Sequence, residues 1–266
     1  MVHSSLTVVS IYGHNDGAGA IPAILKSMEE LPGSIGLLLS SAKPENLPDQ
    51  IEWQQIGYLG YQQYSVFVMH SLHSFINTDY CLIVQDDGWI LNGKNWREEF
   101  YNYDYIGAPC HAAIVNNELK MYFSWVEDKE RIVIQNGGIS LRSKRLLQAP
   151  NKYGLTHIPA QDINLWNEDV QLSGIYRPVL EAYGLRFAPE FLAKHFAIEY
   201  LCPVFHDDLD LSRLVGHHAT SRKLVSASHI VVDLESVVSY REPDVMSHFQ
   251  SLGYTIEYAA NHNHQA

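Results

Sequence analysis

The chain has 266 residues, and its 46% hydrophobic content is sufficient for a substantial core. Its 30 acidic and 18 basic residues give a formal net charge of −12, which argues against a broad surface for the phosphates of a nucleic acid. The three cysteines form no C-x-x-C pair, the first residues lack a secretory signal, and no run approaches the roughly 20 apolar residues of a membrane span. We therefore expect a globular cytoplasmic protein with no transmembrane segment and no nucleic-acid partner.

The first third of the chain alternates predicted strands and helices. Residues 6–12 and 35–39 are rich in apolar and β-branched side chains, which favour strands. Apolar positions recur at helical spacing in residues 21–28, and residues 61–76 place theirs on one face of a second helix. This alternation predicts an α/β, Rossmann-like fold in which helices flank a mixed, mainly parallel sheet.

Two adjacent carboxylates follow the next predicted strand. Residues 80–84 read as a short buried strand, and the chain continues with Gln85-Asp86-Asp87-Gly88. Two like charges at a strand end raise each other's pKa unless a cation lies between them. Ligands bind at the carboxyl ends of strands in open α/β sheets, so this motif indicates a site for a hard divalent metal. A structural turn or a helix-capping aspartate is the alternative.

Two further strands are predicted in the middle of the chain. Residues 103–109 read as a strand that breaks at Pro109, and residues 131–135 as a strand that stops at Asn136-Gly137-Gly138. Tandem glycines allow the backbone to approach a ligand or to adopt a positive φ, and a plain tight turn explains them equally well.

Residues 168–183 carry a helical pattern that is closed by Gly184, and Pro178 within it predicts a kink or a late start. The acidic pair Glu168-Asp169 stands at the beginning of this pattern, where the helix dipole favours negative charge. Such a carboxylate is either a helix cap or a general base that deprotonates an acceptor hydroxyl.

The sequence pattern changes after about residue 223. Residues 226–234 predict a strand, residues 244–252 a short helix, and residues 261–266 a frayed tail. We therefore expect a catalytic domain over residues 1–222 and a C-terminal extension over residues 223–266 that packs on the core and ends in a disordered tail.

The chain contains 14 histidines, so a single histidine is weak evidence. Gly216-His217-His218 follows an apolar segment and could return an imidazole to a metal held by Asp87. His206-Asp207-Asp208 is a competing cluster, although a helix cap explains its aspartates better. His14 lies in the first loop, where a parallel α/β protein often receives a nucleotide, and an exposed loop histidine is equally consistent.

Basic residues follow the double glycine. These residues, Arg142, Lys144 and Arg145, could help to neutralise a diphosphate, with a solvated helix start as the equal alternative.

Taken in order, four of these segments resemble the GT-A superfamily of nucleotide-sugar glycosyltransferases, and most closely a bacterial and viral branch filed as a domain of unknown function. They are residues 82–88, 103–109, 136–143 and 167–170, within a match over roughly residues 6–222. The resemblance implies a GT-A-like fold.

The resemblance also implies roles for single residues. Asp87 corresponds to the last carboxylate of the metal motif that binds Mn²⁺ or Mg²⁺, with Asp86 shaping the donor pocket beside it. Gln85 stands where the family is usually acidic, which makes metal dependence a matter for measurement. His218, or otherwise His217, corresponds to the C-terminal metal-binding histidine.

The remaining expected contacts concern the donor and the acceptor. Asn136-Gly137-Gly138 is similar to the loop that contacts both, and Tyr12, His14 and Asn15 would contact the base and ribose. Asp169 would be the catalytic base of an inverting enzyme.

The resemblance thus implies an enzyme that transfers a sugar from a nucleoside-diphosphate sugar to a hydroxyl of a glycan or polysaccharide. A metal-dependent nucleotidyltransferase or phosphohydrolase is the rival enzyme class. A non-catalytic carbohydrate-binding domain is the other rival, for which 5 Trp and 16 Tyr could supply stacking surfaces. The extension could form a lid, a partner surface or a homo-oligomer contact.

Overall fold

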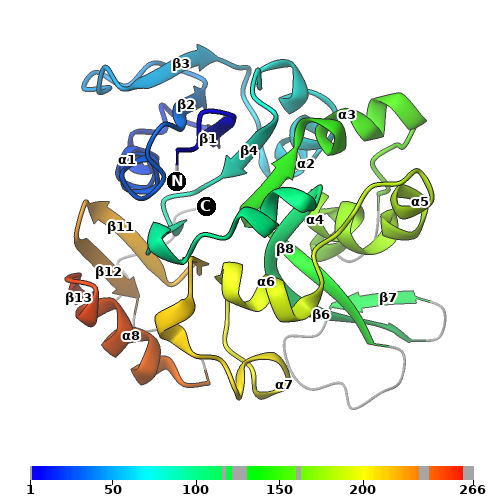
Figure 1. The fold of residues 1–266 in the computed structure, drawn as a ribbon. Coiled ribbons are helices and arrows are strands. Elements are labelled where there is room, and N and C mark those ends of the chain that lie inside the picture. The colour runs from blue at the N-terminus through cyan, green and yellow to red at the C-terminus, as the bar shows by residue number, and fades with distance from the viewer. Residues whose placement is uncertain (1, 116–117, 122–130, 160–162, 234–239, 260–266) are drawn as a thin grey trace.

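The computed structural model describes residues 2–115, 118–121, 131–159, 163–233 and 240–259. A seven-stranded sheet in the order β3-β2-β1-β4-β8-β6-β7 forms its centre (Figure 1). Its strands are β1 (Leu6–Tyr12), β2 (Ile35–Ser40), β3 (Ile51–Gln55), β4 (Tyr80–Ile83), β6 (Tyr105–Val115), β7 (Glu118–Met121) and β8 (Arg131–Ser143). Neighbouring strands are parallel from β3 to β4 and antiparallel from β4 to β7, so the expected mixed α/β sheet is confirmed.

Helices cover both faces of this sheet. Val8 and Leu82 point to the face covered by α1 (Ile21–Glu30) and α6 (Glu190–Phe196). Their neighbours along the strands, Val9 and Ile83, pack instead beneath α2 (Tyr61–His70) and α3 (Lys144–Tyr153). The alternation of side chains along each strand therefore feeds two separate apolar layers. None of the helices in the described part of the chain is long and apolar enough to cross a bilayer.

Shorter helices connect these elements. They are α4 (Glu168–Val170), α5 (Arg177–Ala182), α7 (Pro203–His206), a π-helical turn at Gln171–Ile175, and 3₁₀ turns at Ala18–Ala20, Leu72–Ser74, Gly93–Asn95, Glu98–Asn102, Ile163–Trp166 and Leu211–Arg213. The pattern predicted as one helix over residues 168–183 is thus divided, and Pro178 lies in the first turn of α5, in agreement with the expected late start.

Two predictions for the middle strands are wrong. Strand β6 continues beyond Pro109, and β8 runs through Asn136-Gly137-Gly138 without a break. The register explains both, because Gly107 pairs with Ser140 whereas Pro109 pairs with Gln135. Residues 136–139 therefore bulge from β8 opposite a single residue of β6, which places the proline at an irregularity where it costs no ladder hydrogen bond.

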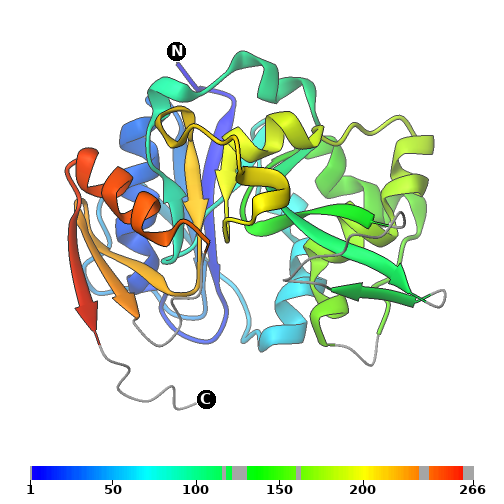
Figure 2. The ribbon, with the colours of Figure 1, turned by 90° about the horizontal axis from the view of Figure 1, so that it is seen from below.

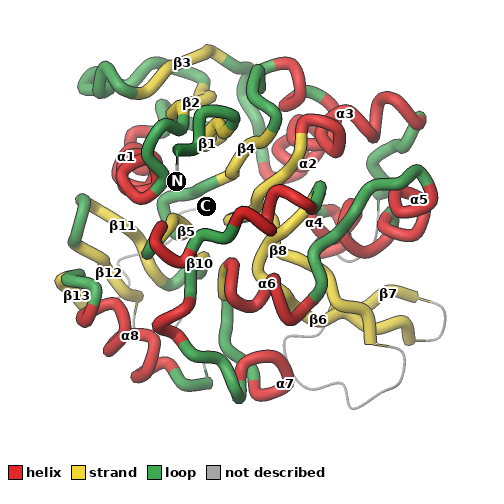
Figure 3. Tube along the Cα trace, in the orientation of Figure 1, coloured by secondary structure: helices red, strands yellow, loops and turns green. Residues whose placement is uncertain are grey.

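A second sheet carries the histidines. Strand β10 (Gly216–His218) lies between β5 (Gly88–Ile90) and β9 (Ala197–Ile198), and Figure 3 shows β5 and β10 side by side. His218 is paired with Gly88, so the second sheet brings the histidine beside the acidic motif.

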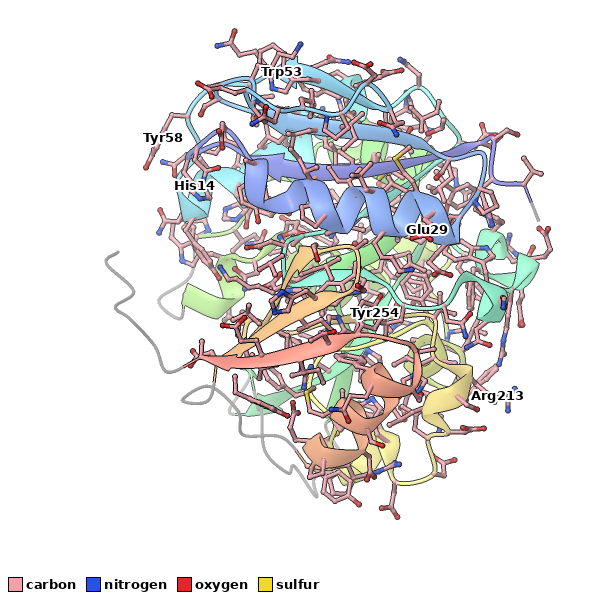
Figure 4. All side chains as sticks on the ribbon, turned by 90° about the vertical axis from the view of Figure 1, so that its left-hand side faces the viewer. His14, Glu29, Trp53, Tyr58, Arg213 and Tyr254 are labelled. Atoms are coloured by element: carbon pink, nitrogen blue, oxygen red, sulfur yellow. The ribbon has the colours of Figure 1, made fainter. Side chains whose placement is uncertain are left out.

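The C-terminal unit is a third sheet of β11 (Arg222–Ser226), β12 (His229–Asp233) and β13 (Thr255–Ala259), with α8 (Glu242–Ser251). Figure 2 shows it, in orange and red, on the opposite side of the molecule from β6 and β7. Its apolar side chains share one cluster with Trp89, whose Nε1 donates to the Tyr254 hydroxyl at 3.0 Å. Tyr254 is labelled in Figure 4. The unit thus packs directly on the rest of the protein. The predicted tail over residues 261–266 lies outside the described residues.

A buried ion pair joins the first strand of this C-terminal unit to its helix. Arg222 of β11 donates from Nη2 and Nε to both carboxylate oxygens of Glu242 in α8, at 2.5 and 3.2 Å. Replacing Glu242 with Ala leaves a buried guanidinium without its partner, so we expect a loss of about 3–5 kcal/mol in the free energy of unfolding, measured by urea denaturation. Asp244→Asn breaks an exposed pair on the same helix and should cost about 0.5 kcal/mol. Equal losses for the two variants would contradict this account.

Candidate active site

A cavity of about 580 Å³ opens at the carboxyl ends of β1 and β4. It is lined by segments that are far apart in the sequence: Ile11, Tyr12, Gly13, His14, Tyr58, Leu59, Gly60, Tyr61, Tyr64, Ser65, Gln85, Asp86, Asp87, Asn136, Gly137, Gly138, Asn167, Glu168, Asp169, Glu199, His218 and Thr220. This is the edge at which open α/β sheets bind ligands.

The acidic motif forms a tight turn between β4 and β5. The backbone N–H of Gln85 donates to the carbonyl of Gly88, and the N–H of Gly88 donates back to Gln85. The Tyr12 hydroxyl donates to Asp86 Oδ1 at 2.5 Å, and Lys223 Nζ lies 3.2 Å from Oδ2. The motif is therefore a structural turn that also places two carboxylates on the cavity wall. The carboxylate of Asp86 is neutralised by Lys223.

Asp87 and His218 lie next to each other on the wall of the cavity. Nε2 of His218 lies 3.4 Å from Asp87 Oδ1, and its Nδ1 lies 3.8 Å from Glu199 Oε1. Burial opposes a charge on either group, but their mutual attraction prevails, lowering the pKa of Asp87 and raising the pKa of His218 to about 9.

His217 points to the other side of β10. Its ring packs 4.1 Å from the ring of Trp89 and 4.8 Å from that of Phe249, measured between centroids. Burial holds its pKa well below the usual value. Because side chains alternate along a strand, only one of the two neighbouring histidines can line the cavity, and that residue is His218.

The bulge of β8 pushes Asn136-Gly137-Gly138 into the cavity wall. Neither glycine has a positive φ. A Cβ on Gly138 would overlap the imidazole of His218, and one on Gly137 would overlap the Glu168 carboxylate and Arg142. Glycine is required at both positions because protein side chains lie against the backbone there. The alternative prediction, that the two glycines form a plain tight turn, is wrong.

The acidic pair at the start of α4 has two different environments. Glu168 accepts a hydrogen bond from Nη2 of Arg142 at 2.7 Å, and the Arg142 side chain is completely buried. Within the described residues no cationic side chain pairs with Asp169, and its oxygens accept hydrogen bonds from the backbone N–H groups of Gly137 and Val170, both at 2.7 Å. Burial, together with the negative charge of Glu168, raises the pKa of Asp169 to about 7.

Ten of the predicted site residues line this cavity, and two do not. Asn15 is exposed and caps its own loop by accepting from the N–H of Gly17, and His217 is buried elsewhere. His206, the competing histidine, is buried in α7, where its Nδ1 accepts from the N–H of Cys202.

The prediction that Arg142, Lys144 and Arg145 help to neutralise a diphosphate is wrong. Arg142 is used by Glu168, Arg145 pairs with Asp104, and Lys144 donates to the carbonyl of Ile76. All three side chains are engaged by other groups of the protein, and none of them lines the cavity.

Sequence reasoning missed several contributors to the site, and three of them contact the acidic motif or His218. Glu199 follows the two-residue strand β9, Tyr64 receives a hydrogen bond from Gln85 Nε2 at 3.3 Å, and Lys223 comes from the C-terminal unit. Only Tyr64 had a usable signal, because it shares a helical face with Tyr61 in the first turn of α2.

Asp87 and His218 fit part of a divalent-metal site. Oδ1 of Asp87 is buried and receives no hydrogen bond from the described residues, and the facing imidazole nitrogen would be a second donor once a cation displaced its proton. The described residues contain no group of three or more His, Cys, Asp and Glu side chains arranged for a metal. Further ligands would therefore have to come from substrate and water.

A family model described as "Protein of unknown function (DUF5672)" matches residues 51–217, and the chain belongs to this family. Among solved structures, the chain is similar to the crystal structure of the glycosyltransferase GlyE from Streptococcus pneumoniae TIGR4, with 11% sequence identity and a TM-score of 0.41. The match covers 92% of this chain and 59% of the other, so the chain spans about three fifths of that structure's length. No curated protein matches the chain.

The raised pKa of Asp169 has a consequence for stability. The carboxyl ionises near pH 4 in the unfolded chain but keeps its proton to about pH 7 in the folded one. The folded state thus binds more protons in this window, and the free energy of unfolding should fall by about 3 kcal/mol between pH 4.5 and pH 8.5 on account of this group. Asp169→Asn should lose this part of the pH dependence, which urea denaturation at the two pH values measures. Identical pH dependences would show that Asp169 ionises normally in the folded protein.

Proposed function

We propose that the protein is an inverting glycosyltransferase that moves a sugar from a nucleoside-diphosphate sugar to a hydroxyl of a glycan or polysaccharide. One observation carries this proposal: Asp169, a carboxylate with a pKa of about 7 and no cation of its own, lies on the wall of the same cavity as Asp87 and His218. A base poised near neutral pH opposite a cation-binding pair is what displacement of a diphosphate by a hydroxyl requires.

In this reaction Asp169 accepts the proton of the acceptor hydroxyl. The bond between the acceptor oxygen and the anomeric carbon forms as the bond from that carbon to the diphosphate breaks, and the diphosphate leaves with the electron pair. Attack opposite the leaving group inverts the anomeric centre. Glu168 is engaged by Arg142, so Asp169 is the member of the acidic pair that is available as the base.

Asp87 and His218 would hold Mn²⁺ or Mg²⁺. The bound cation would supply positive charge to the leaving diphosphate. The remaining donor contacts follow from the cavity lining: Tyr12 and His14, whose rings lie 5.5 Å apart, stand at the end of β1 where the base and ribose would lie. Gln85 adds no charge here, because its side chain is a neutral amide, and its Nε2 group donates to the Tyr64 hydroxyl.

The decisive experiment incubates the protein with a panel of nucleotide sugars and acceptor glycans, with Mn²⁺, with Mg²⁺ and with a chelator. Release of nucleoside diphosphate that depends on the sugar supports glycosyl transfer. Release of pyrophosphate or inorganic phosphate would support a nucleotidyltransferase or phosphohydrolase instead, and saturable sugar binding without turnover would support a carbohydrate-binding domain.

Two substitutions test the assigned roles. Asp169→Asn should leave donor binding within about twofold and lower kcat at least about 100-fold, because only the base is lost. Asp87→Ala should weaken donor binding in the presence of Mn²⁺ and have little effect with the chelator. Calorimetric donor titration and initial rates separate the two effects, and full activity of Asp169→Asn would falsify the base assignment.

The protonation of Asp169 also predicts a pH dependence. The base form is present only above the raised pKa, so kcat/KM should rise with pH through about 7 and then level off. The profile is measured with saturating Mn²⁺ and with Glu181→Gln, an exposed carboxylate of α5, as control. A rate that is flat from pH 5 to pH 8 would contradict this role.

A further inference from the structure

Two exposed tyrosines stand at the mouth of the cavity. The exposed fractions of Tyr58 and Tyr61 are 75% and 60%, and both side chains line the cavity. Large aromatic rings left in water at the mouth of a cavity indicate a surface that is covered when a ligand binds.

The two rings serve different sides of the cavity. Figure 4 shows Tyr58 and His14 at the same end of the molecule, and the N–H of Leu59 donates to the carbonyl of Gly13, which ties the loop carrying Tyr58 to the end of β1. Tyr58 therefore belongs with the residues assigned to the donor. Tyr61 instead donates from its hydroxyl to Asn167 Oδ1 at 2.7 Å, on the side of the proposed base.

Asn167 occupies the N-cap position of α4 but does not cap it. Its side chain makes no hydrogen bond to the helix and is held by Tyr61 instead. Within the described residues, its Nδ2 group has no acceptor, although the side chain lies on the cavity wall directly before Glu168 and Asp169. A fixed aromatic face and an unused amide donor thus lie together beside the base.

We propose that Tyr61 and Asn167 form the subsite for the acceptor, and that the acceptor is a pyranose sugar. A pyranose presents an apolar C–H face that can cover the Tyr61 ring and hydroxyls that can accept from Asn167 Nδ2. A neighbouring hydroxyl of the same sugar would then reach Asp169. This assignment rests on the proposed function and adds to it the class of acceptor and the residues that select it.

The test uses binding of methyl glycosides without a donor. The β-glucoside, β-galactoside, β-N-acetylglucosaminide and α-mannoside are titrated by saturation-transfer NMR, with linear glucitol as a polyol that lacks the ring. Wild type should bind at least one pyranoside and not glucitol, and Tyr61→Ala should weaken that binding about tenfold. Tyr61→Phe keeps the ring but loses the bond to Asn167 and should lie between the two. Tyr258→Ala, an exposed tyrosine of β13, is the matched control and should bind as wild type does.

The subsite is disproved if no pyranoside binds to wild type, or if Tyr61→Ala binds as wild type does while circular dichroism and thermal melting show that it is folded. The result is separable from the proposed reaction. Pyranoside binding that depends on Tyr61 without turnover of any nucleotide sugar supports the subsite and refutes the transferase. Turnover with an acceptor KM that Tyr61→Ala leaves unchanged does the reverse.

Discussion

The buried ion pair between Arg142 and Glu168 is the interaction on which the geometry of the cavity depends. Arg142 lies near the carboxyl end of β8, completely buried, where a guanidinium is tolerated only if it is paired. Its Nη2 group reaches Glu168 at 2.7 Å and the Tyr105 hydroxyl at 3.3 Å, and Nε donates to Ser140. Because Glu168 must lie over β8 to meet this charge, the first turn of α4 is held against the strand. Asp169 follows immediately and is left on the cavity wall with only backbone donors. One ion pair thus gives two adjacent carboxylates opposite environments.

The acidic turn depends in the same way on the C-terminal unit. The N–H of Leu224 donates to the carbonyl of Asp86, the N–H of Ala219 donates to the carbonyl of Asp87, and the Lys223 ammonium lies beside the Asp86 carboxylate. These contacts join a turn after β4 to β11 and to the residue that follows β10, more than a hundred residues later. The unit is therefore part of the support of the cavity, and unfolding it would release the backbone that presents Asp87.

The parts of the fold that were predictable are those governed by local patterns. Strands over residues 6–12, 35–39 and 80–84 and the helices between them follow from apolar spacing alone, and so does the meeting of their carboxyl ends at one edge. The double glycine was misread because its role depends on neighbours distant in sequence: the register of β6 makes the bulge, and His218 and Glu168 occupy the space that side chains would need. Glu199 and Lys223 reach the cavity only through tertiary packing, which no local pattern indicates. The sequence indicated both histidines as candidate metal ligands. Alternation along a strand allows only one of them to face the cavity, and the packing of His217 against Trp89 determines which one does.

The proposed need for a bound cation comes from the substrate and not from the acidic motif. Glu168 is paired with Arg142, Asp86 with Lys223 and Tyr12, and Asp87 with His218. Burial raises the pKa of Glu199, and that of Asp169 is about 7, so the protein accommodates its own carboxylates without help. The diphosphate of the proposed donor would change this balance, because it would add negative charge where the positive groups of the described cavity wall are already paired. Two adjacent aspartates alone do not require a metal here. The substrate would require a metal. Within the described structure, Oδ1 of Asp87 is buried without a hydrogen bond, and this oxygen is where the protein would bind that metal.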